Sequence, residues 1–114
     1  MLNSQRRIDK GLFDQIIKRG FSVYTPLLSL SFLPSPLITT GSRFAIVVSA
    51  KALKMAVDRN KLKRRGRHAI YKNLNRIKNG FLCVFFCKKK MFSLPFKDFE
   101  ETMLKLLSQA NLLR

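Results

Sequence analysis

The sequence contains few of the residues from which catalytic and metal sites are built. Among its 114 residues are six Asp and Glu, one His, two Cys and no Trp. General acid–base and two-metal chemistry need clustered carboxylates or histidines, and the sequence shows no such cluster. His68 has no evident carboxylate partner, and with Cys83 and Cys87 it does not supply four ligands at a recognisable metal-binding spacing. We therefore predict that the protein itself contains neither catalytic residues nor a metal site.

The two cysteines are predicted to be separate buried thiols. Cys83 and Cys87 lie in an apolar segment with strand character, where residues four apart are separated by about 13 Å. A disulfide requires Cα atoms within about 7 Å of each other. Small buried hydrophobic residues are the simplest interpretation of both.

Long apolar segments are also missing. No stretch approaches the roughly 18 consecutive apolar residues of a membrane-spanning helix. The longest apolar segment, 26–38, is interrupted by Pro34 and Pro36. Arg6 and Arg7 make the N-terminus basic, but no apolar block of the signal-peptide type follows them. The sequence predicts a cytoplasmic protein without a membrane partner.

Lysine and arginine dominate the composition, and 23 such residues give a net charge of +17. Such a charge implies a polyanionic partner, for which nucleic acid is the first candidate. An anionic membrane surface fits less well, because a membrane-lying helix needs a wide apolar face and the basic helix predicted below has only a narrow one. The hydrophobic fraction of 46% is typical of globular proteins. We predict one domain over residues 1–114, with residues 1–8 mobile or ordered only on binding.

The cations concentrate in segment 49–78, which holds eleven of the 23 Lys and Arg residues and one carboxylate, Asp58. On a helix with 100° between residues, two opposite stripes emerge. The apolar stripe consists of Met55, Leu62, Ala69, Ile70 and Ile77, with Gly66 and Asn73 between them. The polar stripe consists of Asn60, Arg64, Arg67 and Tyr71, with Lys63 at its border. We predict a helix over 56–77 that packs by its apolar side and binds a polyanion by its polar side, and that stops at Gly80.

The remaining segments predict an α+β fold with the element order α-β-β-α-β-α. A helix over 10–19 begins at an Asp9 cap, and Gly20 is predicted to end it in a left-handed conformation. Pro95 opens an amphipathic last helix. Segments with strand character are 27–33, 43–49 and 81–87, with a further short strand expected over 21–24. One mixed sheet with helices mainly on one face, a small two-layer sandwich, is the predicted architecture.

Segment 56–67, AVDRNKLKRRGR, resembles the signature helix of the bacterial ribonuclease P protein subunit. That family carries roughly A-V-x-R-N-R-x-K-R-x-x-R-E directly after a strand that ends in S-K-K. The matching residues are Arg59, Asn60, Lys63, Arg64 and Arg67 in the helix and Ser49 and Lys51 at the strand end. The order of elements along most of the chain also agrees with the family. Departures from the family pattern are Ala50 in place of a basic residue, Lys61 in place of Arg, Gly66 in place of an apolar residue and His68 in place of Glu.

The resemblance implies a fold of the type seen in domain 2 of ribosomal protein S5, with a left-handed βαβ crossover around the basic helix. It implies that the protein binds the catalytic RNA of ribonuclease P and the 5′ leader of precursor tRNA. The holoenzyme, an endoribonuclease, removes this leader with Mg²⁺. The RNA carries the chemistry and largely holds the metal, so the protein is a non-catalytic monomer within a ribonucleoprotein and does not bind DNA.

The resemblance also implies two sets of site residues. The RNA-binding set is Lys51, Lys54, Arg59, Asn60, Lys61, Lys63, Arg64 and Arg67. A cleft between the first helix and the sheet, expected to receive the leader, contains Phe13, Ile17, Leu30 and Lys88. Ile17 and Leu30 stand where the family tends to carry aromatic residues, which leaves base stacking there open. Phe13 is interpreted as either a core or a cleft residue, and Lys88 as either a gatekeeping charge or a phosphate contact.

An alternative is a structural ribosomal or general RNA-binding protein without a role in cleavage. Its charge would be the same, but it should bind mature and precursor tRNA alike. A DNA-binding helix is disfavoured because no dimerising element or recognition motif is evident. Dependence on the leader therefore distinguishes the two main hypotheses.

Overall fold

The computed structural model describes residues 8–35 and 41–114, so most of the predicted mobile segment 1–8 lies outside the described residues. The described elements follow the predicted order and include the short strand that the sequence suggested. They are α1 (Lys10–Arg19), β1 (Phe21–Tyr24), β2 (Leu28–Pro34), β3 (Arg43–Val48), α2 (Ala56–Lys72), β4 (Phe81–Cys87) and α3 (Phe96–Gln109). Two 3-10 turns, η2 (Leu74–Arg76) and η3 (Lys89–Ser93), flank β4.

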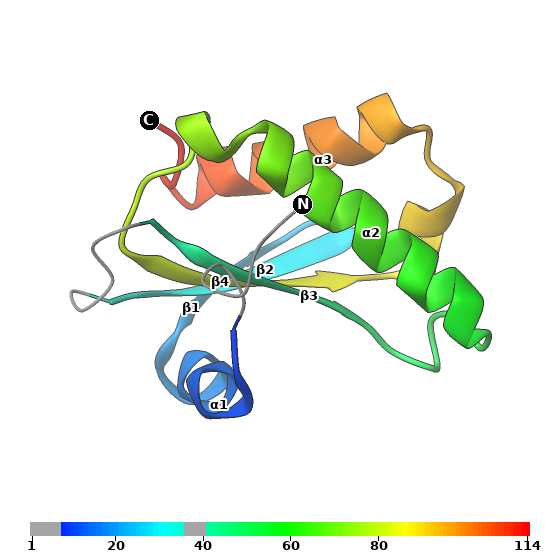
Figure 1. The fold of residues 1–114 in the computed structure, drawn as a ribbon, viewed down its shortest axis with the longest axis horizontal. Coiled ribbons are helices and arrows are strands. Elements are labelled where there is room, and N and C mark those ends of the chain that lie inside the picture. The colour runs from blue at the N-terminus through cyan, green and yellow to red at the C-terminus, as the bar shows by residue number, and fades with distance from the viewer. Residues whose placement is uncertain (1–7, 36–40) are drawn as a thin grey trace.

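The four strands form one mixed sheet in the order β1-β2-β4-β3. Strand β2 is antiparallel to β1 and β4, whereas β3 and β4 are parallel neighbours. In Figure 1 the chain leaves β3 at the right, returns above the sheet along α2 and descends at the left into β4, which lies behind β3. This path is left-handed, the rare sense for a βαβ connection. The predicted α+β class and its crossover are confirmed.

Helices cover both faces of the sheet, with α2 and α3 on one and α1 on the other (Figure 1). The alternation of side chains along β4 divides the apolar residues between two cores. The larger core, under α2 and α3, includes Leu30, Phe44, Ile46, Cys83 and Phe85. The smaller core, under α1, is formed by Ile16, Leu82 and Val84. Helix α1 thus adds a partial third layer to the predicted sandwich.

Both cysteines are buried and free, as the sequence predicted. Burial raises the pKa of the Cys83 and Cys87 thiols, that of Cys87 to about 12. The thiolate is the reactive form of cysteine, and it is scarce at neutral pH in such an environment. The two side chains therefore serve as apolar residues of the larger core.

Helix α1 begins where the sequence predicted, because the Asp9 carboxylate accepts a hydrogen bond from the backbone N–H of Leu12 at 2.9 Å. Gly20 follows its end, but with φ −77° and ψ 168° it is extended, so the predicted left-handed conformation is wrong. Glycine is present here because a side chain at this position would collide with neighbouring backbone atoms. A Cβ atom on Gly20 would overlap the carbonyl oxygen of Ile16 and would lie 2.8 Å from that of Phe32. Gly20 lets α1 pass closely over β2 and turn directly into β1.

Helix α2 is shorter than predicted. Its buried side contains Leu62, Gly66, Ala69 and Ile70 from the predicted apolar stripe. Met55, predicted to belong to that stripe, precedes the helix and is 63% exposed. Ile77 is buried, but it reaches the core from an extended segment that pairs with Leu113. The helix ends at Lys72, five residues before its predicted end at Ile77.

A buried hydrogen-bond network explains this earlier end. The Asn73 side-chain amide donates to the carbonyl oxygen of Ala69 at 2.7 Å and to the Glu100 carboxylate at 2.9 Å. The other carboxylate oxygen of Glu100 lies 3.5 Å from Nζ of Lys72. The last turn of α2 is thereby joined to α3, and the buried Asn73 amide has hydrogen-bond partners on both helices.

Helix α3 follows the prediction closely. Pro95 is its N-cap residue, and Phe99, Met103, Leu106 and Leu107 form its buried side. Among the helices of residues 8–35 and 41–114, none has both the length and the apolar composition required to cross a membrane.

Gly66 allows α2 to approach β3 closely. A Cβ atom on Gly66 would lie 2.9 Å from Cδ1 and 3.1 Å from Cγ1 of Ile46. Glycine inside a helix costs about 1 kcal/mol relative to alanine. The close packing of α2 on the sheet is the structural reason for accepting this cost.

We expect Gly66→Ala to destabilise the protein by about 1 kcal/mol, because overpacking costs of about 1–3 kcal/mol outweigh the gain in helix propensity. Ile46→Val removes the atom nearest to the new Cβ and alone should cost about 1 kcal/mol. The double variant should then lose less free energy of unfolding than the two single variants together, by at least about 0.5 kcal/mol, as measured by urea unfolding. Additive effects would contradict a contact between these two positions.

Candidate nucleic-acid interface

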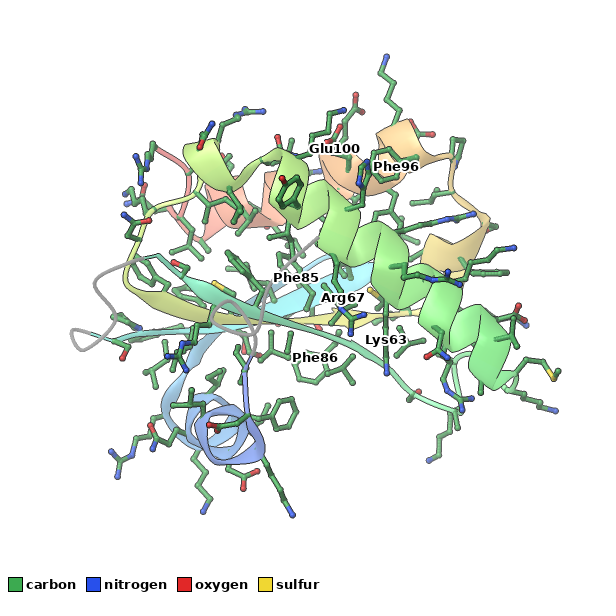
Figure 2. The ribbon with its side chains drawn as sticks, in the orientation of Figure 1. Lys63, Arg67, Phe85, Phe86, Phe96 and Glu100 are labelled. Carbon is green, nitrogen blue, oxygen red and sulfur yellow. The ribbon has the colours of Figure 1, made fainter. Side chains whose placement is uncertain are left out.

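The solvent side of α2 carries the predicted polar stripe. Asn60, Arg64 and Tyr71 are exposed, and Lys63 and Arg67 are partly exposed. Figure 2 shows the side chains of Lys63 and Arg67 leaving the same side of α2, one turn apart. Their arrangement confirms the helical stripe, and their contact with RNA stays a prediction.

This charge is not compensated by the protein. In the described part of the chain, the one ion pair within 4.0 Å is Lys72–Glu100. Asp58 is the single carboxylate on α2 and lies in its first turn, where the helix dipole favours negative charge. The remaining cations of α2 therefore produce a strongly positive surface that a polyanion can neutralise.

Arg59 differs from the other predicted RNA contacts. Its Nη1 atom donates hydrogen bonds to the carbonyl oxygens of Leu53 at 2.8 Å and Lys54 at 2.9 Å. These bonds fix the loop 49–55 against the start of α2, and the same loop exposes Lys51 and Lys54 to solvent. One nitrogen of the guanidinium is therefore structural, and its other N–H groups remain for a ligand.

A hollow of about 440 Å³ opens on the α1 side of the sheet, where β3 and β4 end. Its lining residues are Ser29, Val47, Ser49, Lys51, Ala52, Phe86, Cys87, Lys88 and Lys89. Phe13 of α1 packs edge to face against Phe86, with 6.2 Å between ring centroids. The structure thus places Lys88 and Lys51 in the lining of one hollow, and Phe13 packs against Phe86 of that lining without lining the hollow itself.

The other two predicted cleft residues lie elsewhere. Leu30 is fully buried in the larger core, on the opposite face of the sheet, so its assignment to this cleft is wrong. Along β2 the side chains alternate between faces, and Ser29, Ser31 and Leu33 are on the α1 side. Ile17 lies on α1 but is 52% exposed and outside the core under that helix.

Sequence analysis missed Phe86 as a cleft residue. Every residue of β4 is apolar, so the segment offers no polar alternation to show which side chains share a face. The distance along the chain from Lys88 was an available signal, because residues two apart on an extended segment point the same way. Phe86 could have been placed in the cleft from that spacing.

The described residues contain no metal centre of the usual kind. No three His, Cys, Asp or Glu side chains between residues 8 and 35 or 41 and 114 come together in a group that could hold a metal ion. The site that the structure does present combines cations, hydroxyl groups and aromatic rings. These groups recognise phosphates and bases.

The family profile described as Ribonuclease P matches residues 1–111. The chain belongs to the ribonuclease P protein family. A ribonuclease P protein component of Pelotomaculum thermopropionicum is 31% identical over 102 residues, which cover 90% of this chain and 88% of that protein. The ribonuclease P protein component of Synechococcus elongatus is 41% identical over 71 residues, or 60% of this chain. In that match the chain spans 58% of the length of the relative.

Solved structures agree with this family membership. The ribonuclease P protein of Thermotoga maritima is 30% identical, with a TM-score of 0.81 over 90% of this chain and 96% of its own. The likeness to the ribonuclease P family thus extends from the sequence to the fold.

Proposed function

We propose that this chain is the protein subunit of a ribonuclease P, which binds the catalytic RNA and the 5′ leader of precursor tRNA and so supports endonucleolytic maturation of the tRNA 5′ end. The observation that carries the proposal is the position of the loop 49–55. Its Lys51 lines the hollow beside α1, while the loop itself leads into the cationic helix α2. A surface for a structured RNA and a hollow for a single strand are therefore continuous.

The two surfaces suit different parts of an RNA. The Arg64 and Arg67 guanidinium groups can bind phosphates with two parallel hydrogen bonds, and the Asn60 amide can contact phosphates or base edges. In the hollow, the Phe86 ring offers a surface for an unpaired base. Lys51 and Lys88 supply charge for the phosphates of the same strand.

The chemistry of cleavage is assigned to the RNA subunit. In the proposed holoenzyme the RNA and the substrate phosphates hold most of the Mg²⁺. The protein contributes binding and orientation. The proposed assembly contains the protein as a monomer, works in the cytoplasm, and involves neither DNA nor a membrane.

Reconstitution with a bacterial ribonuclease P RNA tests this proposal. At limiting Mg²⁺, adding the protein should restore cleavage of precursor tRNA, and the complex should bind precursor more tightly than mature tRNA. Replacing Phe86 by Leu should reduce this preference, because leucine fills the hollow without offering a flat ring. RNA binding without rescue, and with equal affinity for both tRNAs, would instead support a structural ribosomal or general RNA-binding protein.

A further inference from the structure

A second hollow lies on the other side of the sheet, where α2 passes the start of α3. It measures about 370 Å³ and is lined by Lys61, Arg64, Arg65, His68 and Phe96. Figure 2 shows Phe96 beside α2, near Glu100. Among the described residues, those that line this hollow include no carboxylate. Cationic side chains therefore surround an aromatic ring in this hollow, which is separate from the hollow beside α1.

The two rings at this hollow contact each other and are reachable from solvent. The centroids of His68 and Phe96 are 5.1 Å apart, with 52° between the ring planes. Nζ of Lys72 lies 5.9 Å from the Phe96 centroid and is itself paired with Glu100. His68 is exposed and Phe96 is partly exposed. Together they form an aromatic surface at the edge of α2.

The cations around these rings divide into two kinds. Arg65 is structural, because its Nη1 atom donates to the carbonyl oxygen of Phe92 at 3.0 Å and its guanidinium lies 5.7 Å from the Phe92 centroid. Lys61 and Arg64 are exposed, and neither belongs to the ion pair described above. Lys61 precedes His68 by seven residues, which corresponds to about 10 Å along the helix. A single nucleotide can span this distance if its base contacts His68 and the long side chain of Lys61 reaches its phosphate.

We propose that this hollow binds one unpaired nucleotide of an RNA, with the base against His68 and Phe96 and the phosphate against Lys61 and Arg64. Aromatic rings flanked by cations are the usual means of holding a single strand without sequence preference. A regular duplex presents phosphates but keeps its base faces stacked, so it would leave the two rings unused. The choice of RNA as the partner rests on the proposed function, and the site adds a second contact for unpaired RNA on the far side of α2.

The absence of Trp from the sequence allows a direct test. Phe96→Trp introduces a single indole at the hollow, whose fluorescence is quenched when a base stacks on it. A short single-stranded adenosine oligoribonucleotide should quench the full-length variant, and an abasic oligonucleotide of equal length should not. Phe21→Trp, at a site on β1 that is 61% exposed, is the matched control and should respond to neither. Equal quenching of Phe96→Trp by both oligonucleotides, or by neither, would overturn the proposal.

Affinity read from the same indole reports this hollow alone. Adding His68→Ala to Phe96→Trp should weaken oligonucleotide binding by about fivefold or more, and adding Lys61→Gln should lower the salt slope by about 0.7. Both residues are exposed, so these changes should leave the melting temperature unchanged. Unaltered affinity and slope would overturn the proposal. Because the probe is an oligonucleotide, failure here is distinct from failure to rescue ribonuclease P RNA.

Discussion

Replacing Arg64 and Arg67 together by alanine should weaken assembly with ribonuclease P RNA by at least about 100-fold. Charge-assisted hydrogen bonds contribute about 1.5–3 kcal/mol each, and every 1.4 kcal/mol is tenfold in affinity. Neither residue takes part in the ion pair of the described chain, and both reach solvent from α2. The double variant should therefore fold with an unchanged melting temperature and fail in binding alone.

A salt series is the decisive measurement for this variant. Removing two phosphate contacts should lower the slope of log affinity against log salt by about 1.4–1.8. Lys18→Ala with Lys105→Ala is the matched control, because it removes the same charge from exposed positions on α1 and α3. Equal losses from both pairs would mean that net charge, rather than this side of α2, governs binding.

Changing the same two arginines to lysine separates charge from geometry. Lysine keeps the positive charge but cannot form the planar bidentate contact of a guanidinium. We expect the double lysine variant to keep the salt slope of the wild type and to have an affinity between those of the wild type and the double alanine variant. Wild-type affinity in the lysine variant would show that the two positions act as point charges only.

The helical stripes of α2 were predictable because they depend on local periodicity. The buried positions from Leu62 to Ile70 and the exposed polar positions opposite them follow directly from 3.6 residues per turn. The end of the helix was not predictable in this way. It depends on the hydrogen bond between Asn73 and Glu100, which are distant in sequence and meet only when α3 packs on α2.

The cleft shows a second limit of local patterns. Strand residues alternate between faces, so an error of one position places a residue on the wrong side of the sheet. Leu30 was assigned to the cleft but lies in the core, and the neighbouring Ser29 lines the hollow instead. In β4 every side chain is apolar, so the strand itself shows no difference between Phe85 and Phe86, which the structure places on opposite faces of the sheet.

The structural role of Arg59 was likewise not predictable from the local sequence. Its place in the family motif suggests an RNA contact, whereas its two hydrogen bonds to loop carbonyls depend on the path of the chain before α2. Gly20 is similar, since a glycine after a helix usually indicates a left-handed cap. Here the close approach of α1 to β2 is the reason for glycine, and the backbone of Gly20 is extended, a conformation that any residue can adopt.

Gly20→Ala should destabilise the protein by about 2–3 kcal/mol, near the upper end of overpacking costs. The atoms that crowd the new Cβ are backbone carbonyl oxygens of Ile16 and Phe32, so no side-chain rotation relieves the contact. Helix α1 must move away from β2, which exposes Ile16, a residue that is 1% exposed in the native protein. Urea unfolding should show a lower midpoint with an unchanged m-value.

Gly11→Ala is the matched control for this change, because it lies on the same helix. Its Cβ would meet only Asp9 Oδ1 at 3.5 Å, so the gain in helix propensity should stabilise the protein by about 0.5–1 kcal/mol. Stability of Gly20→Ala equal to that of Gly11→Ala would contradict the close approach of α1 to β2.

The functional consequence of Gly20→Ala should be selective. Movement of α1 separates Phe13 from Phe86 and alters the hollow proposed for the leader. Helix α2 lies on the opposite face of the sheet and keeps its cations (Figure 1). We therefore expect the variant to lose preference for precursor over mature tRNA while binding ribonuclease P RNA with nearly wild-type affinity, at a temperature where it remains folded. Parallel loss of both affinities would mean that the two surfaces do not act independently.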